Sequence, residues 1–121
     1  MIVYHGNSDP VFSVNHTIDW YEKIRAAEPQ ASDFVRLFTI PGMHHCYGGP
    51  ATDRFDMLTA LVNWVERGVP PASVPAATGP DGNTPWPNRT RPLCPYPQQA
   101  RYVGTGSLED AANFRCVAPA S

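Results

Sequence analysis

The chain has 121 residues, 42% of them hydrophobic, and a formal net charge of -2 at pH 7, which suits one small globular domain. This charge provides neither a basic surface for nucleic acid nor an acidic tail. No apolar run approaches the roughly 20 residues that span a bilayer, and the first residues lack the pattern of a secretory signal peptide. We therefore expect neither a nucleic-acid nor a membrane partner.

The first 68 residues alternate between strand and helix patterns. "MIVYH" is short, apolar and rich in β-branched residues and ends at Gly6, which predicts a strand followed by the loop "GNSDPVF". Residues 14–28 predict a helix that Ser13 or Asn15 caps. Its apolar stripe consists of Ile18, Tyr21 and Ile24.

A second strand and a second helix follow. "FVRLFTI", residues 34–40, has bulky apolar side chains on both faces, as in a strand buried on both sides of a parallel sheet. Residues 52–68 predict a helix that Thr52 caps and that Gly68 ends. Its expected apolar stripe consists of Phe55, Leu58, Leu61, Val62 and Val65. The order is that of a right-handed parallel βαβα unit.

Residues 69–121 form a second, proline-rich segment. Ten of the 14 prolines lie from Pro70 onward, and proline both lacks the amide donor and fixes φ. We expect no long helix and no central strand here, but an irregular tail packed on the α/β segment of residues 1–68. Cys94 and Cys116 are the natural pair for a disulfide in this tail, which would contribute about 3 kcal/mol in the chain-entropy model.

Two parallel strands and two helices cannot cover both faces of a sheet, and they leave strand edges unpaired. We therefore expect these residues to form the C-terminal part of a larger α/β sheet. An oligomer that completes the sheet and a misassigned strand are the alternatives.

The loop "IPGMHHCYGG", residues 40–49, carries the chemistry-bearing side chains. A zinc site is weakly indicated, because three contiguous residues cannot converge easily on one ion and no CxxC or HxxxH spacing exists. A Cys46 nucleophile is also weakly indicated, because catalytic Cys–His pairs meet through the fold and not as sequence neighbours.

A hydrolase triad fits the loop better. In α/β-hydrolases the order is Ser, then Asp or Glu, then His, with acid and base after late strands. Asp9 follows the first predicted strand, and His44 and His45 follow the second, so they meet at one sheet edge. No serine lies in a G-x-S-x-G motif, and a non-catalytic binding module that uses an exposed sheet edge is the main alternative.

Five stretches carry a further signal: "YHGNSDPVFS", "FVRLFTIPGMHHCYGGP", "FDMLTALVNWVERGVPP", "RTRPLCPYPQQARYVGTGS" and "ANFRC". Together they resemble the C-terminal end of the tannase and feruloyl esterase family, near its mono(2-hydroxyethyl) terephthalate hydrolase branch. The resemblance implies an α/β-hydrolase fold and serine-dependent hydrolysis of aromatic esters, such as feruloyl, galloyl or terephthalate monoesters. The serine, the oxyanion donors and the lid with its calcium site have no counterpart here, so no cofactor is expected in this chain, and the chain alone is expected to be inactive.

The resemblance also assigns roles by position. Asp9 matches the catalytic aspartate, and His45, directly before the cysteine, matches the catalytic histidine. Cys46 matches a cysteine that forms a disulfide with a residue preceding the nucleophile, outside this chain. The remaining matches are a tail disulfide between Cys94 and Cys116 and an acyl-pocket lining of His5 and Phe12. Disulfides indicate a secreted or periplasmic parent protein.

Overall fold

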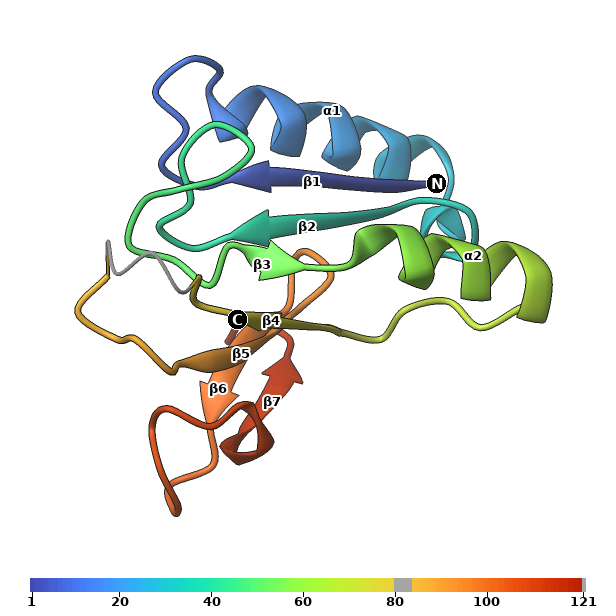
Figure 1. The fold of residues 1–121 in the computed structure, drawn as a ribbon. Coiled ribbons are helices and arrows are strands. Elements are labelled where there is room, and N and C mark those ends of the chain that lie inside the picture. The colour runs from blue at the N-terminus through green and yellow to red at the C-terminus, as the bar shows by residue number, and fades with distance from the viewer. Residues whose placement is uncertain (80–83, 121) are drawn as a thin grey trace.

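The computed structural model describes residues 1–79 and 84–120, and its centre is a pair of parallel strands. Strands β1 (Ile2–Gly6) and β2 (Arg36–Ile40) are joined by helix α1 (Val14–Ala27) and the short 3-10 helix η1 (Ala31–Asp33). In the register, Ile2 lies opposite Arg36 and Gly6 opposite Ile40. The carboxyl ends of both strands therefore meet at one edge, where their loops lie side by side (Figure 1).

Strand β2 is covered on both faces, as its sequence predicts. Leu37 packs with Tyr21 of α1 on one face, while Phe38 and Ile40 pack with another cluster on the opposite face. Leu37, Phe38 and Ile40 are fully buried. The strand begins at Arg36 and not at residue 34, because Phe34 ends η1 and is exposed.

Helix α1 begins and ends close to the predicted bounds, and Ser13 caps it by accepting the amide of Asn15. The second helix differs from the prediction. Helix α2 (Met57–Arg67) is capped by Asp56, four residues later than the predicted cap Thr52, because the preceding strand β3 (Arg54–Phe55) takes part in a second sheet. Much of its predicted stripe is exposed, and Met57 and Ala60 make the buried contact instead.

The expectation of an irregular tail without a central strand is wrong. Strands β4 (Val74–Ala77) and β5 (Thr90–Leu93) form an antiparallel sheet with β3, in which β4 is the middle strand. Pro75 lies opposite Pro92 on β5, and β3 on the other side of β4 extends only along Ala76 and Ala77. Because β3 does not reach Pro75, no strand on that side would need a hydrogen bond from the N–H that Pro75 lacks.

The last part of the chain is a hairpin joined to this sheet by a disulfide. Strands β6 (Gln99–Tyr102) and β7 (Phe114–Val117) pair antiparallel, with the 3-10 helix η2 (Ala111–Asn113) between them. Cys94 and Cys116 form the predicted disulfide, with their Cα atoms 5.5 Å apart.

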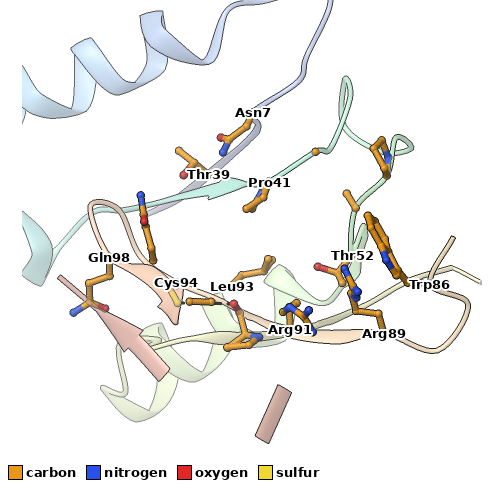
Figure 2. A pocket seen from close by; sticks show the side chains of 16 residues that line it. Asn7, Thr39, Pro41, Thr52, Trp86, Arg89, Arg91, Leu93, Cys94 and Gln98 are labelled. Atoms are coloured by element: carbon orange, nitrogen blue, oxygen red, sulfur yellow. Dashed lines mark hydrogen bonds between the residues drawn. The ribbon is translucent and has the colours of Figure 1, made fainter. Parts of the chain in front are cut away.

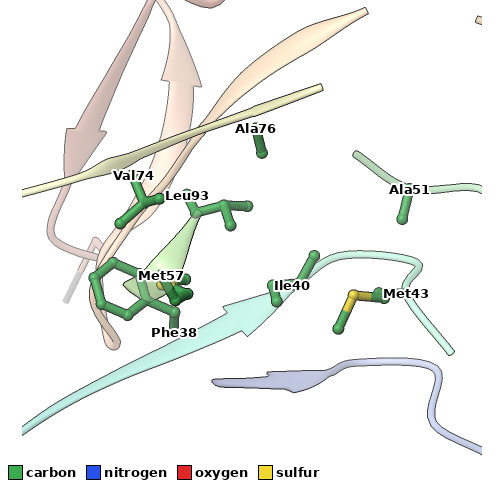
Figure 3. Close-up of a cluster of buried hydrophobic side chains, with 8 residues drawn as sticks. All are labelled: Phe38, Ile40, Met43, Ala51, Met57, Val74, Ala76 and Leu93. Atoms are coloured by element: carbon green, nitrogen blue, oxygen red, sulfur yellow. The ribbon is translucent and has the colours of Figure 1, made fainter. Parts of the chain in front are cut away.

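One hydrophobic core joins the two segments of the chain. Figure 3 shows Phe38 and Ile40 of β2 beside side chains of the tail, including Val74 and Leu93. Side chains of the tail therefore share a core with β2, while the division of the chain at residue 68 stays a prediction. None of the helices that the structure describes has the length and apolar character needed to cross a membrane.

Candidate functional site

The loops after β1 and β2 are bound to each other by backbone hydrogen bonds. The amide of Asn7 donates to the carbonyl of Ile40 at 2.9 Å, and the amide of Ser8 donates to that of Met43 at 3.0 Å. A Cβ atom at Gly6 would meet the carbonyls of Met43 and His44, so only glycine allows this approach. Met43 is fully buried in the core (Figure 3) and anchors the second loop.

This arrangement brings together Asp9 and His45, which are 36 residues apart. Nδ1 of His45 lies 2.8 Å from Oδ2 of Asp9. Because an ionised carboxylate can only accept, Nδ1 carries the proton and Nε2 of His45 is the nitrogen left to act as a base. The side chain of Asp9 is 4% exposed and that of His45 is 44% exposed. The imidazole is thus open to a reactant, while its acidic partner is enclosed.

The carboxylate of Asp9 is surrounded by donors. Its Oδ1 accepts the amides of Val11 at 2.8 Å and Phe12 at 3.0 Å. Burial alone would raise the pKa of Asp9, but the hydrogen bond from His45, those from the two amides and the attraction of the His45 charge outweigh it. The pKa of Asp9 therefore lies well below its usual range, and the group is ionised at neutral pH.

The loop that carries His45 is closed by its own glycines and by an aspartate. The amide of His44 donates to the carbonyl of Gly48 at 3.1 Å, and the amide of Gly48 donates to Oδ2 of Asp53 at 2.8 Å. Cys46 follows His45 with φ of 66°, in the left-handed region that a non-glycine residue rarely adopts. Its thiol is free and exposed.

The two predicted pocket residues differ in their surroundings. Phe12 is exposed, and its ring centroid lies 5.5 Å from that of His45. His5 is largely enclosed, and its Nδ1 lies 2.8 Å from the hydroxyl of Thr17 on α1. Its Nε2 lies 2.9 Å from the carbonyl oxygen of Phe12 and 3.1 Å from Oδ2 of Asp9.

Sequence reasoning missed two supporting residues, Thr17 and Asp53. Thr17 could have been found from the strand alternation, because His5 points to the α1 face of the sheet and Thr17 lies one turn into that helix. Asp53 had no comparable signal, since its role depends on how the glycine loop turns back.

Two hollows are lined in part by residues of these loops. One of about 440 Å³ is lined by Asp9, His45, Phe12 and His5 and lies at the candidate site. The other, of about 540 Å³, lies between β2 and the tail and includes neither Asp9 nor His45. Figure 2 shows the latter, with Arg89, Arg91 and Trp86 among its lining residues. Within residues 1–79 and 84–120, no group of three or more His, Cys, Asp or Glu side chains could hold a metal ion.

Comparisons with known proteins cover nearly the whole chain. The family model described as "Tannase and feruloyl esterase" matches residues 1–117. The chain is 58% identical over 119 residues to mono(2-hydroxyethyl) terephthalate hydrolase of Piscinibacter sakaiensis, covering 98% of this chain and 20% of that protein. Feruloyl esterase C of Talaromyces stipitatus is 30% identical over 135 residues, which covers 97% of this chain and 26% of that protein.

A solved structure shares the same fold. The crystal structure of feruloyl esterase B from Aspergillus oryzae superposes with a TM-score of 0.78 at 32% identity, over 96% of this chain and 26% of that one. The chain therefore spans about a fifth to a quarter of the length of these relatives.

Proposed function

Because the chain belongs to the tannase and feruloyl esterase family, we propose that it supplies the aspartate and histidine of a Ser-His-Asp triad in a carboxylic ester hydrolase. The observation that carries this proposal is the hydrogen bond between Nδ1 of His45 and Oδ2 of Asp9 at 2.8 Å. A triad base requires a ring with one nitrogen hydrogen-bonded to an enclosed carboxylate and the other nitrogen accessible to the reactant. We further propose that β1 and β2 are the last two strands of an α/β-hydrolase sheet.

The proposed reaction is acyl transfer through a serine that lies outside this chain. The serine oxygen attacks the ester carbonyl carbon while Nε2 of His45 takes the hydroxyl proton. The carbon–oxygen bond to the alcohol then breaks, and His45 returns the proton to the departing oxygen. Water attacks the acyl-serine by the same proton transfers and releases the acid. Asp9 holds the ring and stabilises the imidazolium at each step.

Cys46 is proposed to join the histidine loop to the loop that carries the nucleophile. Its free, exposed thiol directly follows His45 and is therefore available to a cysteine outside this chain. Such a bond would restrict the distance between base and nucleophile, on which proton transfer depends. Together with the disulfide between Cys94 and Cys116, it supports a secreted or periplasmic location for the protein, because disulfides persist in oxidising compartments.

Aromatic esters are the proposed substrates. The relatives include a mono(2-hydroxyethyl) terephthalate hydrolase and feruloyl esterases, and the exposed ring of Phe12 stands beside His45 in the hollow. We propose that Phe12 contacts the aromatic acyl group. His5 was predicted to share this role, but its ring nitrogens face Thr17, Phe12 and Asp9, so any contact it makes with substrate would be through the ring itself.

The test measures initial rates of the full-length gene product on mono(2-hydroxyethyl) terephthalate, methyl ferulate and methyl gallate. His45→Ala and Asp9→Asn are expected to lower kcat by about 10⁴-fold, while the neighbouring His44→Ala keeps at least roughly a tenth of the rate. The isolated 121-residue chain is expected to show no turnover. Hydrolysis of these esters that survives His45→Ala, or that the isolated chain performs, would overturn the proposal.

A further inference from the structure

We propose that His5 is a positioning residue. Its imidazole keeps the carboxylate of Asp9 in the orientation in which that carboxylate binds His45. This inference rests on the proposed function, since it assigns the part that a second histidine plays in the same site. It also gives His5 a role different from that of a substrate contact.

The proton of the His5 ring is placed by its neighbours. Nε2 lies 2.9 Å from the carbonyl oxygen of Phe12 and 3.1 Å from Oδ2 of Asp9. Both of these atoms are acceptors, so Nε2 must carry a proton. In the neutral ring, Nδ1 then accepts from the hydroxyl of Thr17 at 2.8 Å. Thr17 on α1 thus selects the tautomer of His5, as carboxylates and carbonyls do for other functional histidines.

The carboxylate of Asp9 is contacted on both of its oxygens. Oδ1 takes the amides of Val11 and Phe12, and Oδ2 faces Nδ1 of His45 at 2.8 Å and Nε2 of His5 at 3.1 Å. The Nε2–H of His5 donates to the carbonyl oxygen of Phe12 and lies beside Oδ2. The three donated hydrogen bonds therefore hold the carboxylate in place, and the His5 ring limits its rotation. Without His5, the pair of amides would still hold Oδ1, but Oδ2 would keep only His45.

The enclosure of His5 supports positioning over substrate contact. Its side chain is 13% exposed, against 44% for His45, and both of its ring nitrogens are engaged within the chain. Because α1, β1 and the loop of Asp9 meet at this ring, His5 couples the helix to the carboxylate.

The test uses steady-state kinetics of the full-length gene product on an aromatic monoester. His5→Phe keeps a flat ring of similar reach without a donor, and it is expected to lower kcat by about 10- to 100-fold with KM within about twofold of wild type. His5→Gln can place an amide N–H near the position of Nε2 and is expected to recover much of this loss. Tyr21→Phe is the control, because it removes a buried hydrogen bond to Val35 outside the hollow that Asp9 lines and should leave kcat unchanged.

A double-mutant cycle separates positioning from substrate contact. In the Asp9→Asn background, His5→Phe is expected to have little further effect, because its partner is already altered. An effect that persists in full in that background, or one confined to KM, would overturn the proposal. If His5→Phe does not fold, Thr17→Val serves instead: it should lower kcat several-fold, and an unchanged kcat would refute the inference. Failure of the proposed function itself would be recognised separately, by activity that survives Asp9→Asn and His45→Ala.

Discussion

Gly6→Ala is expected to disable the site without touching either member of the Asp9–His45 pair. Gly6 ends β1, and a Cβ built there lies 2.8 Å from the carbonyl carbon of Met43 and closer still to the carbonyl oxygens of Met43 and His44. Ordinary contacts begin at 3.4 Å, so the histidine loop must retreat by roughly 1 Å, a displacement that can cost about 10²-fold in rate. Met43 cannot yield readily, because it is fully buried in the core.

The assay compares kcat for an aromatic ester with thermal unfolding followed by circular dichroism. Gly68→Ala is the matched control: Gly68 has φ of 67° at the C-cap of α2, and nothing lies within 4 Å of an added Cβ. It should lower stability through backbone strain alone and leave kcat unchanged. A folded Gly6→Ala protein whose kcat stays within about threefold of wild type would refute the idea that the contact of the two loops sets the catalytic geometry.

Three further predictions concern stability. Replacing Cys94 and Cys116 together with serine should lower the free energy of unfolding by about 3 kcal/mol, since their bond closes a loop of 22 residues; an unchanged urea midpoint contradicts this. Asp56→Ala should lower the thermal midpoint by about 5 °C, because Asp56 accepts the amide of Thr59 as the cap of α2, whereas Asp56→Asn should keep most of the cap. Hydrogen bonding to Arg89 lowers the pKa of Glu109 from its ordinary value of 4.5, so this pair stabilises the fold above that pH and the contribution is lost as the pH falls below it. Urea midpoints should therefore drop on acidification below about pH 4.5, and Glu109→Gln should show a smaller drop than wild type.

The α/β segment and the meeting of Asp9 with a histidine of the next loop could be predicted from the sequence because they depend on local patterns, whereas the choice of His45 over His44 came from the family resemblance. Ile18, Tyr21 and Ile24 repeat at helical spacing, and β2 is apolar on both faces. The parallel topology then places both functional loops at one edge, whatever the details of packing. The sequence could not show whether the two side chains touch, and the structure places Nδ1 of His45 2.8 Å from Oδ2 of Asp9.

The tail could not be predicted in the same way, because its structure depends on pairing between distant residues. Pro75 argues against a central strand when it is considered alone, yet it lies opposite Pro92 and beyond the short β3. The late start of α2 has a similar cause, since Arg54 and Phe55 form a strand that pairs with β4 and are therefore not part of the helix. Tertiary pairing outweighed local propensity in both places.

The supporting contacts of the site were hidden for a related reason. Thr17 and Asp53 have ordinary sequence surroundings, and their partners, His5 and Gly48, lie in other segments or in the turn of a glycine loop. Residues that touch the reactant stand out by type, whereas the residues that hold them are identified only by geometry.

The most direct test of the account is the proton on the His45 ring. A long-range ¹H–¹⁵N correlation spectrum of the full-length protein, recorded about two units above the ordinary histidine pKa of about 6.5, reports which nitrogen is protonated. We expect the proton of His45 on Nδ1, at low field through its hydrogen bond to Asp9, and a change of that signal in Asp9→Asn. A proton on Nε2 in the wild-type protein, or a spectrum that Asp9→Asn leaves unaltered, would contradict the shared proton on which the proposed esterase function depends.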